Sequence, residues 1–178
     1  MKKTTILFAL TVVSAMAFAQ KKTTTSATVK FDATTSLDAL PLAENKTVIA
    51  AIDPAKGTVA FEAAVKSFSF SNPMMQEHFN GERWMDSEKF PKSSFAGKIT
   101  NLADVNFAKD GTYTAKIDGE LTMHGVTKPL STTAIITVKG GAVTTTSDFT
   151  IKAADFGIGD AGGKVAKEPK ISVTADFK

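Results

Sequence analysis

Cysteine is absent from the 178-residue sequence, and this absence removes several functional classes together. Without a thiol the chain can form no disulfide scaffold, no thiolate metal site and no lipid anchor on cysteine, and it has no thiol nucleophile. Arginine is nearly absent too, because Arg83 is the only arginine among 21 basic residues. Nucleic-acid readers normally cluster arginine, whose guanidinium fork grips phosphates and guanine edges. We therefore expect no nucleic-acid partner.

Histidine is also scarce, and this scarcity limits the catalytic and metal-binding sites that the chain can form. His78 and His124 are the only histidines, and neither stands in a spaced metal-ligand pattern. No Gly-x-Ser-x-Gly elbow and no phosphate-binding glycine motif is present. We predict no metal site, no catalytic residue and no enzyme activity. A Ser-His-Asp triad depends on geometry rather than spacing, so a lipid-acting enzyme that uses His78 or His124 is kept as the least favoured alternative.

The first 19 residues have the pattern of a secretory signal peptide. Lys2 and Lys3 precede an apolar run that begins at Ile6, and Ala17 and Ala19 form a small-x-small cleavage site. The apolar run is shorter than the roughly 20 residues that a membrane-spanning helix needs. We expect cleavage after Ala19, a single domain over residues 20–178, and a periplasmic or secreted protein.

Beyond the leader, apolar residues recur at every second position, which indicates β-strands. The alternating sets are Ala27, Val29 and Phe31; Val48, Ala50 and Ile52; Val59, Phe61, Ala63 and Val65; Phe95 and Ile99; Tyr113, Ala115, Ile117, Gly119 and Leu121; Ala134, Ile136 and Val138; Val143, Phe149 and Ile151; and Ile171, Val173, Ala175 and Phe177. Eight or nine short strands joined by turn signals favour an antiparallel barrel or sandwich. No alternation of strands with helices appears, so a doubly wound fold is not expected.

The segment around residues 65–95 departs from this pattern. The alternation changes phase between Val65 and Phe68, which predicts a β-bulge or bend near 66–67. Asn72 and Pro73 have the residue types of a helix N-cap and first helical position, so we predict a helix from 73 to about 80. Met75 and Phe79 should lie on its buried face, near Phe68, Phe70, Trp84 and Phe95, with Gln76 and Glu77 outside. The aromatic residues of this region form either a plug at one end of a barrel or the mouth of an apolar pocket.

Three runs, in this order and spacing, resemble the signatures of the YceI-like family. They are Phe68-Ser-Phe70 with Met75-Gln-Glu-His78-Phe79-Asn80, Trp84-Met85-Asp86-Ser87, Lys89-Phe90-Pro91 and Phe95-Ala-Gly97; then Gly119-Glu-Leu121 with His124-Gly125-Val126-Thr127; and finally Asp155-Phe156-Gly157-Ile158. The resemblance covers roughly residues 26–178. It implies an all-β, lipocalin-like eight-stranded antiparallel barrel with one short helix after the third strand.

The resemblance also implies a function, namely an exported lipid-binding or carrier protein without catalysis. Its cargo would be an apolar lipid such as a polyisoprenoid or a quinone tail, it would need no other cofactor, and it would contact the membrane surface transiently. The residues that we expect to line the ligand site are Phe61, Val65, Phe70, Met75, Phe79, Trp84, Phe95, Ile117 and Leu121. The alternative is a ligand-free structural or stress-response envelope protein whose barrel is filled by side chains. The oligomeric state stays open.

His124 and Gly125 lie between two predicted strands, where a turn is expected. A glycine directly after the histidine suggests a positive φ that only glycine adopts at low cost. We predict that this is a structural turn and that the His124 ring hydrogen-bonds to nearby backbone.

Overall fold

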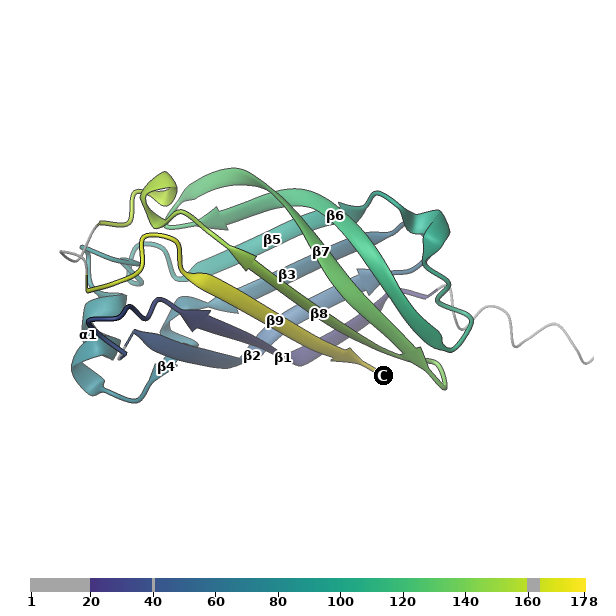
Figure 1. Cartoon of the computed structure of the whole chain (residues 1–178), viewed down its shortest axis with the longest axis horizontal. Helices are drawn as coiled ribbons and strands as arrows, with labels where there is room; N and C mark the ends of the chain where they lie inside the picture. Colours follow the sequence, from purple (N-terminus) through teal and green to yellow (C-terminus); the bar gives the residue numbers. More distant parts are fainter. Residues whose placement is uncertain (1–19, 40, 160–163) are drawn as a thin grey trace, which may run out of the picture.

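Nine β-strands account for most of the computed structural model, which describes residues 20–39, 41–159 and 164–178 (Figure 1). The strands are β1 (Lys22–Asp32), β2 (Leu42–Asp53), β3 (Thr58–Ala64), β4 (Ser69–Phe70), β5 (Lys92–Ile99), β6 (Gly111–Met123), β7 (Val126–Lys139), β8 (Ala142–Thr150) and β9 (Lys170–Phe177). The helical elements are α1 (Pro73–Asn80) and the 3₁₀ turns η2 (Val65–Ser67), η3 (Leu102–Asp104) and η4 (Ala153–Phe156). The predicted leader, residues 1–19, lies outside the described residues.

The strands close into a barrel. Their order is β1-β9-β8-β7-β6-β5-β3-β2, and β1 pairs with β2 to complete the ring. All these pairings are antiparallel, and the two-residue β4 adds only to the start of β2. The predicted eight-stranded antiparallel barrel, with one short helix after its third strand, is therefore confirmed.

Alternation of side chains along the strands places the core inside the ring, with one change of phase in β2 between Asn45 and Val48. In β6, Ala115, Ile117 and Leu121 are buried, whereas the outward residues Lys116, Asp118 and Glu120 are exposed. The outward positions are largely threonine, lysine and acidic residues, which suit a solvated face of a strand. The sequence pattern thus decided which face of each strand points inward.

Two tight hairpins set the register of the long strands β6, β7 and β8. His124 and Gly125 both have positive φ, at 49° and 73°, and Gly140 and Gly141 have φ of 56° and 84°. Two consecutive positive values are the signature of the type I′ turn, whose twist matches that of paired strands. The predicted positive φ at Gly125 is confirmed.

The phase change after Val65 is a 3₁₀ turn rather than a bulge within a strand. In η2 the N–H of Phe68 donates to the carbonyl of Val65 (3.2 Å), and the N–H of Val65 donates to the carbonyl of Pro91 (2.9 Å). A β-bulge keeps the strand paired on both sides of the extra residue. Here the pairing of β3 ends at Ala64, because the chain leaves the sheet. This turn carries the chain out of the wall and towards α1.

Helix α1 lies across one end of the barrel (Figure 1). Asn72 caps it by accepting from the N–H of Met74 (2.9 Å), and Phe79 is buried, as predicted. The prediction for Gln76 was wrong: its side chain is half-buried, and its Oε1 accepts from the N–H of Phe70 (3.2 Å). The long Gln76 side chain accepts a hydrogen bond from a backbone N–H at the unpaired edge of β4. Helical periodicity alone does not reveal such a contact.

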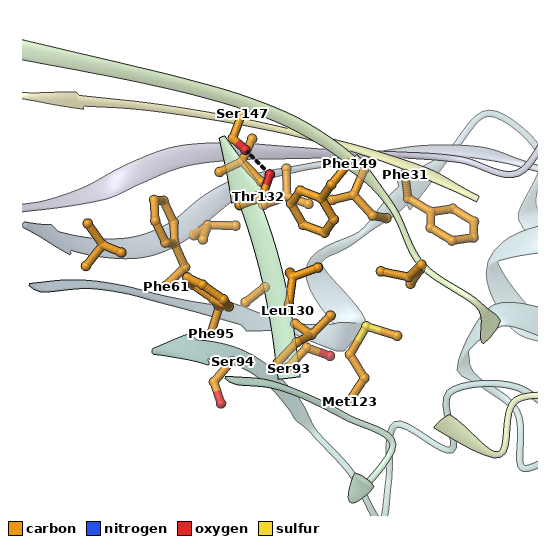
Figure 2. A pocket seen from close by; sticks show the side chains of 18 of the residues that line it. Phe31, Phe61, Ser93, Ser94, Phe95, Met123, Leu130, Thr132, Ser147 and Phe149 are labelled. Atoms are coloured by element: carbon orange, nitrogen blue, oxygen red, sulfur yellow. Dashed lines mark hydrogen bonds between the residues drawn. The ribbon is translucent and has the colours of Figure 1, made fainter. Parts of the chain in front are cut away.

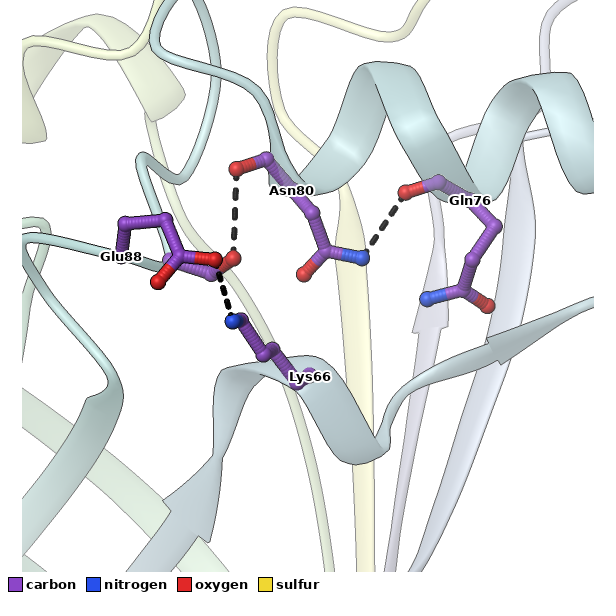
Figure 3. Close-up of polar contacts among 5 residues, drawn as sticks. Lys66, Gln76, Asn80 and Glu88 are labelled. Atoms are coloured by element: carbon purple, nitrogen blue, oxygen red, sulfur yellow. Dashed lines mark hydrogen bonds and ion pairs between the residues drawn. The ribbon is translucent and has the colours of Figure 1, made fainter.

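The loop after α1 is tied back to the helix and to η2. Asn80 Nδ2 donates to the carbonyl of Gln76 (2.9 Å), and Ser87 Oγ donates to the carbonyl of Asn80 (3.2 Å). Lys66 and Glu88 form an ion pair at the edge of this group (Figure 3). These contacts hold Trp84 and Met85 beneath the helix, at the end of the barrel.

Candidate functional site

A cavity of about 140 Å³ lies inside the barrel. Its wall is built from the inward faces of the strands, and several rings point into it, among them Phe61, Phe95 and Phe149 (Figure 2). None of the residues that line it in the described part of the chain carries a charge. A charged group placed here would lose its hydration without a partner, so the cavity suits apolar matter.

The end of the barrel that carries the β7–β8 hairpin is closed by tightly packed aliphatic and aromatic side chains. Phe177, Ile52 and Ile136 form the cavity floor and are each about 1% exposed. Val138 and Val143, which flank the Gly140–Gly141 hairpin, are equally buried. The cavity therefore does not continue to this end.

The other end is covered by rings under α1. Phe79 packs against Phe31 and Trp84 with ring centroids 5.7 and 6.3 Å apart, and it also touches Phe68 (5.6 Å) and Phe70 (5.0 Å). Tilted and edge-on arrangements of this kind are favourable for aromatic pairs. These five aromatic side chains form an apolar partition at the α1 end of the barrel.

A second cavity of about 250 Å³ lies on the outer side of this partition. Phe31, Phe79 and Trp84 line both cavities, so these three rings form a shared wall between them. The outer cavity differs in character, because ionisable side chains contribute to its wall. They are Asp38, His78 and Lys164.

The residues predicted to line a ligand site divide between the two cavities. Phe61, Phe79, Trp84, Phe95, Ile117 and Leu121 line the inner cavity, and Phe70, Met75, Phe79 and Trp84 line the outer one. Val65 is fully buried and lines neither, because it sits in η2 where the chain leaves the wall. The binding role of these residues stays a prediction.

Phe95 is not where the sequence reasoning placed it. Instead of joining the rings under α1, it lies within the barrel opposite Phe61 on β3. Its ring covers the facing pair Gly97 and Gly119, where an added Cβ would lie 2.7 and 2.6 Å from the Phe95 ring. The two glycines leave the space that this ring occupies.

The predicted set of ligand-lining residues omits several side chains of the inner cavity, although the alternation had already placed Phe31 and Phe149 on the apolar faces of their strands. Phe31, Thr132, Thr145, Ser147 and Phe149 all face the inner cavity. The inward phase of β8 marks the last three, since they follow Val143 at every second position. Threonine and serine at inward positions were the available signal, and it was overlooked because hydroxyl residues are so common in this chain.

His124 joins parts of all three sequence signatures. Its Nδ1 donates to the carbonyl of Phe156 (3.0 Å), and its ring lies edge-on to Phe90 (4.8 Å between centroids). The predicted hydrogen bond to backbone is therefore present, although its partner lies 32 residues away rather than within the turn. Gly125 is held close to Phe90 as well, because an added Cβ would lie 2.5 Å from that ring.

Two carboxylates near the start of β9 have lowered pKa values. The pKa of Asp32 falls because the N–H of Thr34 donates to its Oδ1 (3.0 Å) and the Thr34 hydroxyl does so too (2.8 Å), with a smaller effect from Lys170. The Ser172 hydroxyl lowers the pKa of Asp148, again helped by Lys170. Neither carboxylate lines either of the two cavities.

Over residues 20–39, 41–159 and 164–178, no group of three or more histidine, aspartate or glutamate side chains could hold a metal ion. Within the same ranges, no helix is long and apolar enough to cross a membrane.

Comparison with known proteins matches the chain to one family. A model of the YceI-like domain matches residues 3–177. Among solved structures, a polyisoprenoid-binding domain from Saccharophagus degradans, implicated in plant cell wall breakdown, is 12% identical with a TM-score of 0.75, covering 89% of this chain and 97% of that one. Burkholderia cenocepacia BcnA is 20% identical with a TM-score of 0.69, covering 85% and 96%. A mutant Campylobacter jejuni YCEI protein is 17% identical with a TM-score of 0.53, covering 100% and 99%. At these identities the likeness shows a shared fold. No curated protein matches the chain significantly.

Proposed function

The chain belongs to the YceI-like family, and from that premise we propose that it is an exported lipid-binding protein that holds an apolar chain inside its barrel. The observation that carries the proposal is the inner cavity, which no charged side chain lines among the described residues. The name of one structural neighbour, a polyisoprenoid-binding domain, supports a prenyl chain as the cargo.

The size of the cavities bears on how a chain could fit. At about 140 Å³ the inner cavity resembles those that hold a single benzene molecule. The rings of Phe31, Phe79 and Trp84 line both this cavity and the outer one of about 250 Å³. If they turned aside, the two cavities would join, and the total volume would fall in the usual range of ligand pockets. We propose that a bound chain displaces this partition.

The energetics suit a carrier. Each CH₂ group removed from water gains about 0.8 kcal/mol, so a long prenyl chain would not leave a membrane unprotected. A membrane offers similar burial to the barrel, so transfer between them is nearly balanced. Leu37, Leu42 and Met74 are exposed by 50% or more near α1 and the segment beside it, and we propose that they make transient contact with the membrane surface.

The direct test is to purify the protein from its own cell envelope and analyse it by native mass spectrometry and organic extraction. A prenyl lipid bound in a fixed ratio would support the proposal, whereas protein without extractable lipid would contradict it. Sequencing the mature N-terminus tests export, and we expect it to begin at Gln20.

A matched pair of variants tests the location. Thr145→Phe places a ring in the inner cavity, and Thr146→Phe places the same ring on the outer face of the same strand. We expect the first to lower lipid content strongly and the second to leave it near wild type. Equal lipid content in both folded variants would show that the inner cavity is not the binding site.

A second function is favoured by one specific observation. The rings of Phe61, Phe95 and Phe149 point into the barrel interior (Figure 2). A ligand-free structural or stress-response envelope protein would need such filling. We propose no catalytic role, because the Nδ1 of His124 is engaged by a backbone carbonyl and its ring by Phe90.

A further inference from the structure

The barrel wall divides between β7 and β8. Their ladder runs from Ala134↔Ser147 to Lys139↔Ala142, although β7 begins at Val126 and β8 continues to Thr150. Before Ala134, β7 pairs only with β6, and after Ser147, β8 pairs only with β9. The two strands therefore diverge towards the α1 end and form a fork, which we define as residues 130–133 of β7 and 147–150 of β8 (Figure 1).

Two hydroxyl groups lie at the vertex of the fork. Thr132 Oγ1 and Ser147 Oγ are 3.1 Å apart, and both side chains line the inner cavity (Figure 2). Their neighbours Leu130 and Phe149 on the same inward faces are apolar. A polar pair in an apolar wall needs hydrogen-bond partners, and so it is a specific feature of the cavity.

The hydrogen-bond directions show what this pair can still bind. Ser147 Oγ donates its hydrogen to the carbonyl of Thr133 (2.8 Å). Thr132 Oγ1 then donates to Ser147 Oγ or to the same carbonyl (3.4 Å). Each hydroxyl has one hydrogen and two acceptor lone pairs. Both hydrogens are already used, so only acceptor capacity is left for a ligand.

The lack of charged side chains among the described residues that line the inner cavity further restricts the kind of ligand group that can bind at the fork. No charged residue lines the inner cavity in the described part of the chain, so an ionised ligand group at the fork would have no counter-ion there. Burying an unpaired ion is far more costly than burying a neutral hydroxyl that finds a hydrogen bond. A neutral donor is the group that the site complements.

We propose that Thr132 and Ser147 form a subsite that accepts the O–H of an alcohol or phenol at the end of an apolar chain. The inference rests on the proposed lipid binding and adds the chemistry of the head group and its place in the wall. It favours a prenol or a quinol over a carbonyl head group such as an oxidised quinone, because a carbonyl offers no hydrogen.

The test compares geranylgeraniol with its methyl ether, which has the same chain but no O–H. Trp84 is the only tryptophan and lines the inner cavity, so its fluorescence reports binding of either ligand. We expect wild type to bind the alcohol about five- to tenfold more tightly than the ether, the usual effect of one hydrogen bond. In the double variant Thr132→Val with Ser147→Ala, this preference should vanish while the affinity for the ether stays within about twofold of wild type.

A control variant changes the same residue types on the outer face of β7. Thr133→Val with Ser131→Ala should keep the preference for the alcohol, since both side chains are exposed. The proposed subsite, but not lipid binding, is overturned if the Thr132–Ser147 variant still prefers the alcohol. It is also overturned if wild type binds the alcohol and the ether equally. Failure of wild type to bind either ligand overturns the proposed lipid binding as well, so the two failures are distinguishable. The ether affinity also reports whether each variant is folded.

Discussion

The two ends of the barrel are built from the same strands but reach opposite outcomes. At the end of the β7–β8 hairpin, Phe177 and Ile136 form the floor of the inner cavity, and they are as fully buried as Val143, which does not line it. At the α1 end, a cavity, a partition of rings and a second cavity follow one another. The closed end is filled by side chains of the barrel strands together with Val105 and Phe107, which are buried in the loop after η3. The α1 end is instead covered by a helix and short turns outside the barrel strands.

The way in which each end is held explains the difference. The closed end has continuous ladders, including Val138↔Val143 beside the hairpin. The α1 end is covered by η2, α1 and η4. These elements are attached to the strands by ring contacts and by isolated hydrogen bonds, such as the one from His124 to Phe156. Elements secured by few bonds separate at lower cost than ladders do. We therefore expect the closed end to contribute more to stability, and we expect a ligand to enter at the α1 end.

The largest expected effect tests whether the closed end carries the stability. Phe177→Ala should lower the free energy of unfolding by about 3–5 kcal/mol, the cost of emptying a well-packed site. Phe149→Ala removes the same ring from a half-buried position and should cost about half as much or less, because the Phe149 ring has fewer packed neighbours to lose than the fully buried Phe177 ring. Chemical denaturation of lipid-free protein measures both. Equal losses would contradict the proposed division.

The next effect concerns Gly119, which lies on β6 beneath the Phe95 ring in the inner cavity. A Cβ at Gly119 would lie 2.4 Å from the carbonyl oxygen of Ala96 and 2.6 Å from the Phe95 ring. Gly119→Ala should therefore destabilise the protein by about 1–3 kcal/mol through overpacking. Gly81→Ala is the control: that position has an ordinary φ of −71° and no atom closer than 3.4 Å. Thermal unfolding compares them, and a neutral Gly119→Ala would show that the backbone adjusts there.

His124 tests how weakly the cover of the α1 end is held. His124→Ala removes the hydrogen bond to Phe156 and the contact with Phe90, and it should cost about 1–2 kcal/mol. His124→Asn should cost less, because asparagine tolerates the positive φ of 49° better than alanine does. Lipid content per folded molecule should stay near wild type in both. Loss of lipid without loss of stability would place His124 in the binding site.

The smallest effect is a pH dependence. The lowered pKa of Asp32 means that its ionised form stabilises the fold, and this contribution is complete above the ordinary aspartate pKa of about 3.9. It is lost as the pH falls through the lower pKa of the folded state. Asp32→Asn should reduce stability at neutral pH by under about 1 kcal/mol, since the group is partly solvated.

Thermal melts at neutral and acidic pH provide the measurement. The gap between wild type and Asp32→Asn should narrow as the pH falls below about 4. Thr34→Val, which removes the hydroxyl donor but keeps the N–H donor, should fall between the two. A gap that is independent of pH would mean that the carboxylate contributes nothing through its charge.

The sequence by itself determined the strands and their inward faces. Alternation in β6 identified Ala115, Ile117 and Leu121 as core, and His124 with Gly125 marked the hairpin. It also identified α1 and its cap at Asn72. These features depend on local periodicity and local backbone preference, which a sequence displays directly.

Only the tertiary structure decided what the interior does. It placed Phe95 over Gly97 and Gly119, and it separated β7 from β8 at Ala134 so that Thr132 meets Ser147. A period of two tells which side of a strand a residue faces, but not which residue of a distant strand it meets or where two strands part. Those outcomes depend on register, twist and the volumes of side chains from all eight barrel strands, and they exist only once the barrel has closed.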